Sequence, residues 1–170
     1  MSIEKNSHLA VFGGSFDPFH QGHQTIIDEA LKTLDISALI LVPTYLNPFK
    51  QSFSKSPSER LKALQQIKFD TRVTITDFEI QQNQPTPTIK TIEHFMKMYQ
   101  PTKIYLIIGA DNLAKLSTWS EYEKLKELVE FVVATRDNIV IPPHYKVLDV
   151  KEDISSTALR SKEAQSLEPK

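Results

Sequence analysis

Short, continuous apolar runs alternate along the chain with longer segments in which apolar residues recur at helical spacing. The continuous runs predict buried strands, because strands of a parallel sheet are covered on both faces. These runs are residues 9–12, 38–42, 103–109 and 130–135. Residues 73–76 alternate apolar and polar side chains, which is typical of a strand with one less buried face. Residues 147–150 predict a last short strand.

Helix-start signals precede several of the segments with helical spacing. Ser56 is the expected N-cap of one helix, with Pro57 at its first position and Glu59 completing a capping box. Thr86 and Pro87 open another, after a polar loop at residues 81–87. The first strand is followed by a helical pattern made of Ile26, Ile27, Ala30, Leu31 and Leu34. This succession predicts the α/β class: a doubly wound, mostly parallel sheet in a three-layer α/β/α sandwich, Rossmann-like, forming one domain over residues 1–170.

Composition narrows the class of protein. The chain has 170 residues, 40% of them hydrophobic and 24% charged, with a net charge of −1. No apolar run approaches the ~20 residues of a membrane span, and residues 1–7 lack a hydrophobic signal core, so we expect a cytoplasmic protein. The absence of cysteine excludes disulfides, thiol catalysis and cysteine-ligated metals. The near-neutral net charge argues against a broad surface for nucleic acid. A phosphate site in this chain must therefore rely on positive charge placed locally.

The strongest chemical signal lies where the first strand gives way to the first helix. Two adjacent glycines, Gly13 and Gly14, end the strand there, and His20 and His23 fall near the helix start. A helix N-terminus attracts anions through its unpaired N–H groups and its dipole, and glycines let a phosphate approach the backbone closely. Two histidines add donors. The segment therefore predicts a phosphate site.

Other interpretations of this segment have to be weighed. It is neither G-x-G-x-x-G nor the P-loop, because the glycines are adjacent and no lysine follows. A plain strand-to-helix turn with two incidental polar residues stays possible. A metal pair is disfavoured, since the two histidines lack the i, i+4 spacing and the remaining ones, His8, His94 and His144, are scattered singly.

Residues 13–23, Gly-Gly-Ser-Phe-Asp-Pro-Phe-His-Gln-Gly-His, resemble the signature of the nucleotidyltransferase superfamily, whose H-x-G-H histidines hold ATP phosphates. The superfamily's second signature is matched by residues 154–160, Ile-Ser-Ser-Thr-Ala-Leu-Arg. Residues 107–113, Ile-Ile-Gly-Ala-Asp-Asn-Leu, followed by Trp119, resemble bacterial nicotinate-nucleotide adenylyltransferases in particular. The resemblance implies an enzyme that adenylylates nicotinate mononucleotide with ATP, giving deamido-NAD and pyrophosphate, with Mg²⁺ brought by the ATP phosphates.

The resemblance also assigns roles residue by residue. Catalytic roles fall to His20, His23 and Arg160. ATP binding falls to Gly13, Gly14, Ser15, His20, His23, Gly109, Asp111, Ser155, Ser156, Thr157 and Arg160. Nicotinate mononucleotide binding falls to Lys50, Thr86, Thr88 and Trp119. The chain departs from the family pattern where Phe49 replaces a histidine, where Arg136 is followed by aspartate instead of proline, and where Ser120 replaces a common tyrosine.

The residues themselves allow plainer interpretations of most of these positions. Asp111 follows a strand and can accept two ribose hydroxyls, but a lone aspartate there is more often an N-cap, and only the family resemblance favours the ribose. Lys50 can be a solvated loop lysine, and Thr88 a simple capping residue. Thr157 and Arg160 share one face of a helix start, which favours a second anion site, but a serine cap followed by a surface arginine is the alternative. Trp119 is by default a core residue.

A site that discriminates between nicotinate and nicotinamide needs a group that binds the negatively charged carboxylate favourably. Thr118 is expected to cap a helix running through Tyr122 and Leu125, which would leave backbone N–H groups around Trp119 free for the carboxylate. Thr86 or Thr88 could add a donor at another helix start.

Two other functions are left open by the sequence. A phosphopantetheine adenylyltransferase or a cytidylyltransferase would share both signatures without needing the 109–119 segment. A nucleotide-sensing module that binds ATP without turnover is the alternative from another class, although the intact histidines and Arg160 argue against it.

Overall fold

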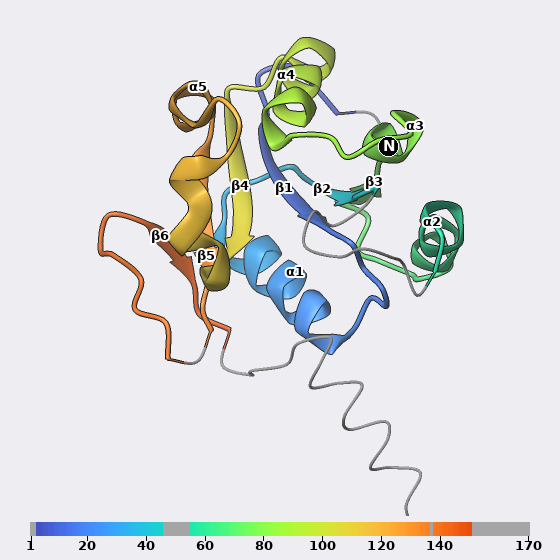
Figure 1. The fold of residues 1–170 in the computed structure, drawn as a ribbon, viewed down its shortest axis with the longest axis horizontal. Helices are drawn as coiled ribbons and strands as arrows, with labels where there is room; N and C mark the ends of the chain where they lie inside the picture. The colour runs from blue at the N-terminus through green and yellow to red at the C-terminus, as the bar shows by residue number, and fades with distance from the viewer. Residues whose placement is uncertain (1–2, 46–54, 137, 151–170) are drawn as a thin grey trace, which may run out of the picture.

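The fold is a single six-stranded parallel sheet (Figure 1), seen in a computed structural model that describes residues 3–45, 55–136 and 138–150. The strand order is β3-β2-β1-β4-β5-β6, and every neighbouring pair is parallel. The strands are β1 (His8–Gly14), β2 (Ala38–Pro43), β3 (Val73–Ile75), β4 (Lys103–Gly109), β5 (Glu130–Ala134) and β6 (Lys146–Leu148). The continuous apolar runs are thus strands, as predicted.

Helices cover both faces of the sheet, which gives the predicted doubly wound three-layer sandwich (Figure 1). The helices are α1 (Gln21–Thr33), α2 (Pro57–Gln65), α3 (Phe78–Gln81), α4 (Thr88–Tyr99) and α5 (Tyr122–Leu128), with a 3-10 helix, η1 (Ala110–Thr118). Successive strand residues point to opposite faces. One face packs on α1 and α2, for example at Ile27 and Leu64, and the other on α4, η1 and α5, for example at Phe95, Leu116 and Leu125.

The helix starts in the structure can be compared with those predicted from local sequence signals. Ser56 and Glu59 form the predicted capping box: the Ser56 hydroxyl accepts from the Glu59 N–H at 3.2 Å, and the Glu59 carboxylate accepts from the Ser56 N–H at 3.4 Å. Helix α4 begins at Thr88 with Pro87 as N-cap, so Thr86 lies in the preceding loop. Within the described residues α3 and η1 are the elements that the pattern missed, because both are too short or too tightly wound to show a 3.6-residue period.

The order of strands creates a switch point at the centre of the sheet. From β1 the chain winds through β2 and β3 on one side, and then crosses to β4 on the other side of β1. Connections therefore diverge from the carboxyl ends of β1 and β4. In open α/β sheets this is the place where ligands bind.

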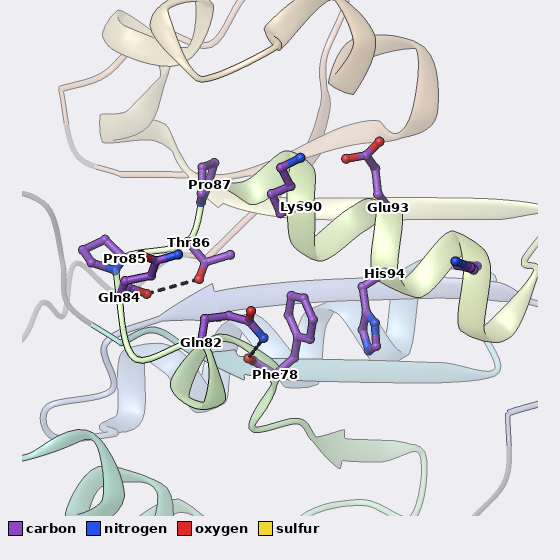
Figure 2. Close-up of a pocket in the computed structure, with 10 residues that line it drawn as sticks. Phe78, Gln82, Gln84, Pro85, Thr86, Pro87, Lys90, Glu93 and His94 are labelled. Carbon is purple, nitrogen blue, oxygen red and sulfur yellow. Dashed lines mark hydrogen bonds between the residues drawn. The ribbon is translucent and has the colours of Figure 1, made fainter.

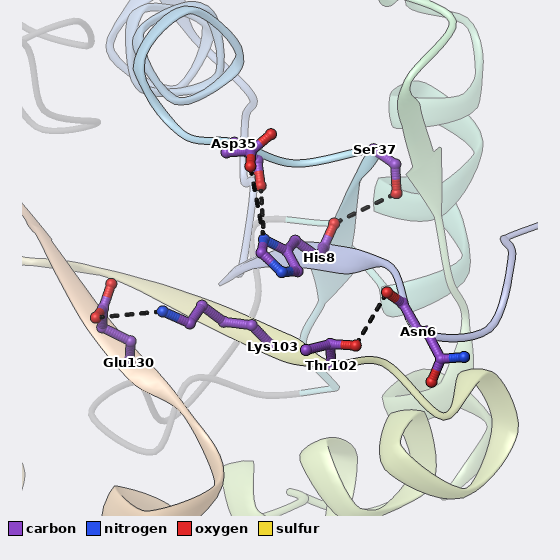
Figure 3. Close-up of polar contacts among 7 residues, drawn as sticks. All are labelled: Asn6, His8, Asp35, Ser37, Thr102, Lys103 and Glu130. Carbon is purple, nitrogen blue, oxygen red and sulfur yellow. Dashed lines mark hydrogen bonds and ion pairs between the residues drawn. The ribbon is translucent and has the colours of Figure 1, made fainter.

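The opposite edge of the sheet is held together by polar contacts between loops (Figure 3). The Thr102 hydroxyl donates to the Asn6 carbonyl at 3.0 Å, and Lys103 lies 3.8 Å from the Glu130 carboxylate. His8 contacts Asp35 there, far from the switch point. Within the described ranges, no helix combines the length and apolarity needed to cross a membrane.

Candidate active site

The carboxyl end of β1 and the start of α1 form the core of the candidate site. Gly13 and Gly14 end β1, as predicted, and they pair there with Val42 and Pro43 of β2. Ser15 begins the connection to α1. Gly14 packs under the Phe16 ring, since a Cβ placed on it would lie 3.2 Å from that ring. The last two residues of β1 consequently carry no side chains of their own.

His20 and His23 build the N-terminus of α1 as a reciprocal cap. His20 is the N-cap residue, and its Nδ1 accepts from the Gly22 N–H at 3.0 Å. The His23 Nδ1 accepts in turn from the His20 N–H at 3.1 Å. An Nδ1 that accepts cannot carry a proton, so each neutral ring has its N–H at Nε2. The two rings stack with their centroids 3.9 Å apart. The arrangement places two imidazole rings at a helix N-terminus, with each Nδ1 used as an acceptor in the cap.

The His23 ring sits among aromatic side chains that fix its plane. It stacks on Phe19 at 5.3 Å between centroids and meets Phe16 edge-on at 5.0 Å. Burial among these rings, together with the nearby His20, lowers the pKa of His23 to about 3. The imidazole is therefore neutral across the physiological range, which keeps its Nδ1 available for the cap.

At the end of β4, its last residue Gly109 and the nearby Asp111 lie on the other side of the switch point. Gly109 pairs with Ala134 of β5, and two residues further along each segment the Asp111 carboxylate lies 3.6 Å from the Arg136 guanidinium. The Asp111 Oδ1 rests against Gly109, where an added Cβ would come within 2.7 Å of it. Asp111 is more than half exposed, so its carboxylate faces the solvent at the edge of the crevice.

The residues predicted for the nicotinate side are more scattered. Thr88 is the first residue of α4, and the Thr86 hydroxyl donates to the Gln84 carbonyl at 3.2 Å in the loop before it. Of the predicted site residues that the structure describes, Thr86 alone lines a hollow of about 550 Å³ between α3, this loop and α4 (Figure 2). Trp119 is half-buried against the hydrophobic cluster under α4 and α5, in line with its default interpretation as a packing residue.

The predicted cap at Thr118 is wrong. The Thr118 hydroxyl donates to the Lys115 carbonyl inside η1, and α5 has Glu121 as its N-cap residue in the left-handed region. The Trp119 N–H donates to the Leu116 carbonyl and the Tyr122 N–H to the Trp119 carbonyl. The Trp119 N–H is therefore engaged in a turn at the end of η1 and is not one of the free carboxylate donors that the sequence suggested.

Comparisons with known proteins agree with this geometry. A model of the cytidylyltransferase-like family matches residues 11–162. A probable nicotinate-nucleotide adenylyltransferase of a Nitratiruptor species is 53% identical over 153 residues, covering 89% of this chain and 86% of the relative. One from Sulfurimonas denitrificans is 52% identical over 163 residues, covering 95% and 88%. The chain belongs to the nicotinate-nucleotide adenylyltransferase family.

Solved structures of nicotinate-nucleotide adenylyltransferases share the fold. The Plasmodium falciparum nicotinic acid mononucleotide adenylyltransferase complexed with NaAD superimposes with a TM-score of 0.74 at 20% identity, covering 94% of this chain and 82% of that one. A putative nicotinate-nucleotide adenylyltransferase from Vibrio parahaemolyticus gives a TM-score of 0.64 with 94% and 82% covered. At this level of identity the likeness concerns the architecture.

Several residues that the adenylyltransferase resemblance singles out lie outside the described residues. They are Lys50 and the second-signature residues Ser155, Ser156, Thr157 and Arg160. Their roles stay predictions. The described part of the site is consequently the first signature, the Gly109–Asp111 segment and the start of α4.

The structure also adds buried polar residues near this adenylyltransferase site that sequence reasoning missed. Arg60 of α2 is buried and bonded to the loops after β1 and β2, and Asp17 is buried beside it. Glu79 of α3 is buried and accepts from the Thr91 hydroxyl at 2.6 Å. Neither Arg60, on the charged helix α2, nor Glu79, the one charged residue of the short helix α3, gives a signal of burial in the sequence. Only the packing identifies it.

Proposed function

We propose that this chain is an enzyme that transfers the adenylyl group of ATP to nicotinate mononucleotide, giving deamido-NAD and pyrophosphate in NAD biosynthesis. The observation that carries the proposal is the pair of stacked histidines that cap α1 beside the two glycines that end β1. The curated relatives carry the name of this activity, and the Plasmodium falciparum enzyme is a complex with NaAD. We also propose that residues 1–170 act as one domain.

The chemistry asks for alignment and charge stabilisation more than for proton transfer. The 5′-phosphate of the mononucleotide is ionised at neutral pH and attacks the α-phosphorus of ATP directly, while the bond to the β-phosphate breaks and pyrophosphate leaves. His20 and His23 donate through Nε2 to phosphate oxygens, and Arg160 adds charge from the second signature. A general base is not required, and His23 with its pKa near 3 would be fully neutral at the working pH.

The remaining ATP contacts follow from the same crevice. Gly13, Gly14 and Ser15 allow the phosphates to approach the backbone, and Ser155, Ser156 and Thr157 of the second signature are the further phosphate contacts that the resemblance implies. Asp111 accepts the ribose hydroxyls from the end of β4. Mg²⁺ would be bound mainly by the ATP phosphates and water, as is usual for this cation with nucleotides.

Gly109→Ala tests the ribose contact without removing the aspartate. A Cβ at residue 109 would lie 2.7 Å from the Asp111 Oδ1, so the carboxylate must swing away from its position. We expect KM for ATP to rise about tenfold, equivalent to about 1.4 kcal/mol, the scale of a hydrogen bond to a charged group. Steady-state kinetics check this. Gly13→Ala, whose Cβ would meet no protein atom closer than 3.6 Å, tests separately whether the phosphates need a close approach to the backbone. An unchanged KM for ATP in Gly109→Ala would contradict the role of Asp111.

Release of pyrophosphate in the presence of nicotinate mononucleotide, nicotinamide mononucleotide or phosphopantetheine tests the substrate. We expect kcat/KM to favour nicotinate over nicotinamide mononucleotide about ten- to a hundredfold. Because Thr118 does not cap α5 and the Trp119 N–H is engaged, we assign the discriminating positive end to α4, whose N-cap Pro87 supplies no side-chain cap and whose first turn contains no acidic residue. Thr88 lies in this turn, and Lys50 and Trp119 complete the proposed mononucleotide site.

The competing functions give different results in the same assay. Turnover with phosphopantetheine alone would identify another transferase of the superfamily, and ATP binding without pyrophosphate release would identify a sensing module. Equal kcat/KM for the two mononucleotides would contradict selection by a helix start.

A further inference from the structure

Arg60 is the most deeply buried charged side chain that the structure describes, at 1% exposure. It lies on α2, and its guanidinium donates to three backbone carbonyls. Nη1 donates to Ser15 at 2.6 Å, while Nη2 donates to Thr44 at 2.7 Å and to Tyr45 at 2.8 Å. One side chain thus connects two loops that are distant in sequence.

The two loops leave adjacent strands at the same edge of the sheet. Gly14, the last residue of β1, pairs with Pro43, the last residue of β2, and the Thr44 N–H donates to the Gly14 carbonyl at 3.0 Å. Past these residues the sheet ladder ends, and the next carbonyls need other donors. Arg60 supplies these donors from α2.

The geometry suits an arginine specifically. Burial lowers the pKa of Arg60, and the buried carboxylate of Asp17 opposes that shift. A planar guanidinium can reach several carbonyls at fixed angles, whereas an ammonium is a single point with a larger hydration cost. Placing a cation here is costly unless its hydrogen bonds are made, so the two loops and α2 are held in one arrangement.

The loop after β1 also contains a strained backbone position. Phe16, directly after Ser15, has a φ of 48°, in the left-handed region that a bulky residue seldom adopts. The Ser15 carbonyl bonded to Arg60 fixes the plane of the Ser15–Phe16 peptide and so the direction in which the neighbouring N–H groups point. These groups follow the glycines proposed to receive the ATP phosphates.

We infer that Arg60 is a positioning residue: from inside the protein it sets the orientation of the Gly13–Ser15 backbone, and thereby the affinity for ATP and the alignment of its phosphates. This inference rests on the proposed function. At 1% exposure Arg60 does not reach the substrate itself, so it acts through the carbonyls that it holds. A displacement of about 1 Å in a positioning group can cost about a hundredfold in rate.

Arg60→Lys and Arg60→Ala, assayed with ATP and nicotinate mononucleotide, test the inference. Lysine keeps the positive charge but lacks the planar guanidinium that reaches several carbonyls. We expect kcat/KM for ATP to fall about ten- to a hundredfold, with a raised KM for ATP. Millimolar guanidinium chloride should restore Arg60→Ala at least about fivefold, while sodium chloride at equal ionic strength should not. Arg72→Ala is the matched control, because Arg72 also donates to a backbone carbonyl, that of Leu31 at 3.3 Å, away from the site.

The outcomes separate three possibilities. If Arg60→Lys is folded, with a melting temperature below that of the wild type but with wild-type kcat and KM, Arg60 is only structural and the inference is overturned. If Arg60→Ala does not fold, Arg60→Lys alone decides. If the wild type itself shows no turnover with any mononucleotide, the proposed function fails, and ATP binding by calorimetry then tests Arg60 on its own: an unchanged affinity in Arg60→Lys would overturn the inference.

Discussion

His23→Asn is expected to lower kcat by about 10²–10³, the usual effect of losing one donor to developing charge. Asparagine can place its Oδ1 where the Nδ1 of His23 accepts from the His20 N–H, so the cap of α1 is retained. The side chain ends before the position of Nε2, so the donor proposed for the ATP phosphates is lost. His20→Asn should act in the same way, because its own cap bond to Gly22 is also made by Nδ1.

Comparison with alanine separates catalysis from packing. His23→Ala removes both nitrogens and leaves space among the surrounding phenylalanines, so it should lose stability as well as turnover. His94→Ala is a control for the loss of a stacked ring, since His94 lies 4.1 Å from Phe78 between centroids and away from the switch point. A folded His23→Asn enzyme with near-wild-type kcat would exclude His23 from the phosphate site.

Glu79→Gln is expected to stabilise the protein at pH 8 by about 1–3 kcal/mol. Burial raises the pKa of Glu79 to about 7 from an ordinary value near 4.5, although the Thr91 hydroxyl favours the ionised form. A raised pKa in the folded state means that the native protein holds a proton which the unfolded chain has released. The free energy of unfolding therefore falls as the pH rises from about 4.5 to 7 and stays lower above it. Each pKa unit is worth about 1.4 kcal/mol, which bounds the effect.

Denaturant unfolding at pH 5 and pH 8 measures this difference. Glutamine is neutral at both, and its amide oxygen can still accept from Thr91, so the variant should show a flatter dependence on pH. Thr91→Val gives the opposite sign: it removes the donor to the Glu79 carboxylate and should destabilise the protein more at pH 8 than at pH 5. If the wild type and Glu79→Gln unfold with the same pH dependence, Glu79 is not the titrating group.

The strands were predictable because burial on both faces requires uninterrupted apolar runs. Residues 103–109 match β4 residue for residue, and the start of α2 followed from the Ser56 and Glu59 capping box, which is a contact within one turn. Differences at other ends are small and come from tertiary pairing. Gly13 and Gly14 remain in β1 because Val42 and Pro43 continue beside them.

Contacts between segments were beyond the reach of the sequence. Thr118 has the residue type of an N-cap, but η1 continues to it and engages its hydroxyl with Lys115. Arg60 and Glu79 look like solvated helix residues until α2 and α3 are placed against the sheet edge. A phosphate site at His20 and His23 was predicted from the glycines and the helix start and strengthened by a resemblance, whereas their use of Nδ1 as acceptors, and hence the tautomer, required the structure.

The position of β1 in the sheet has a consequence for the order in which the protein is made. β1 is synthesised first, and its neighbour β2 follows after one helix, but its other neighbour is β4, with Phe12 beside Ile107. A growing chain that ends before Lys103 contains the complete first signature, but β1 then has only one of its two neighbouring strands, β2. Closing a pairing between such distant segments is entropically slow. The first motif to leave the ribosome therefore acquires the second wall of its crevice only after residues 103–109 have been made.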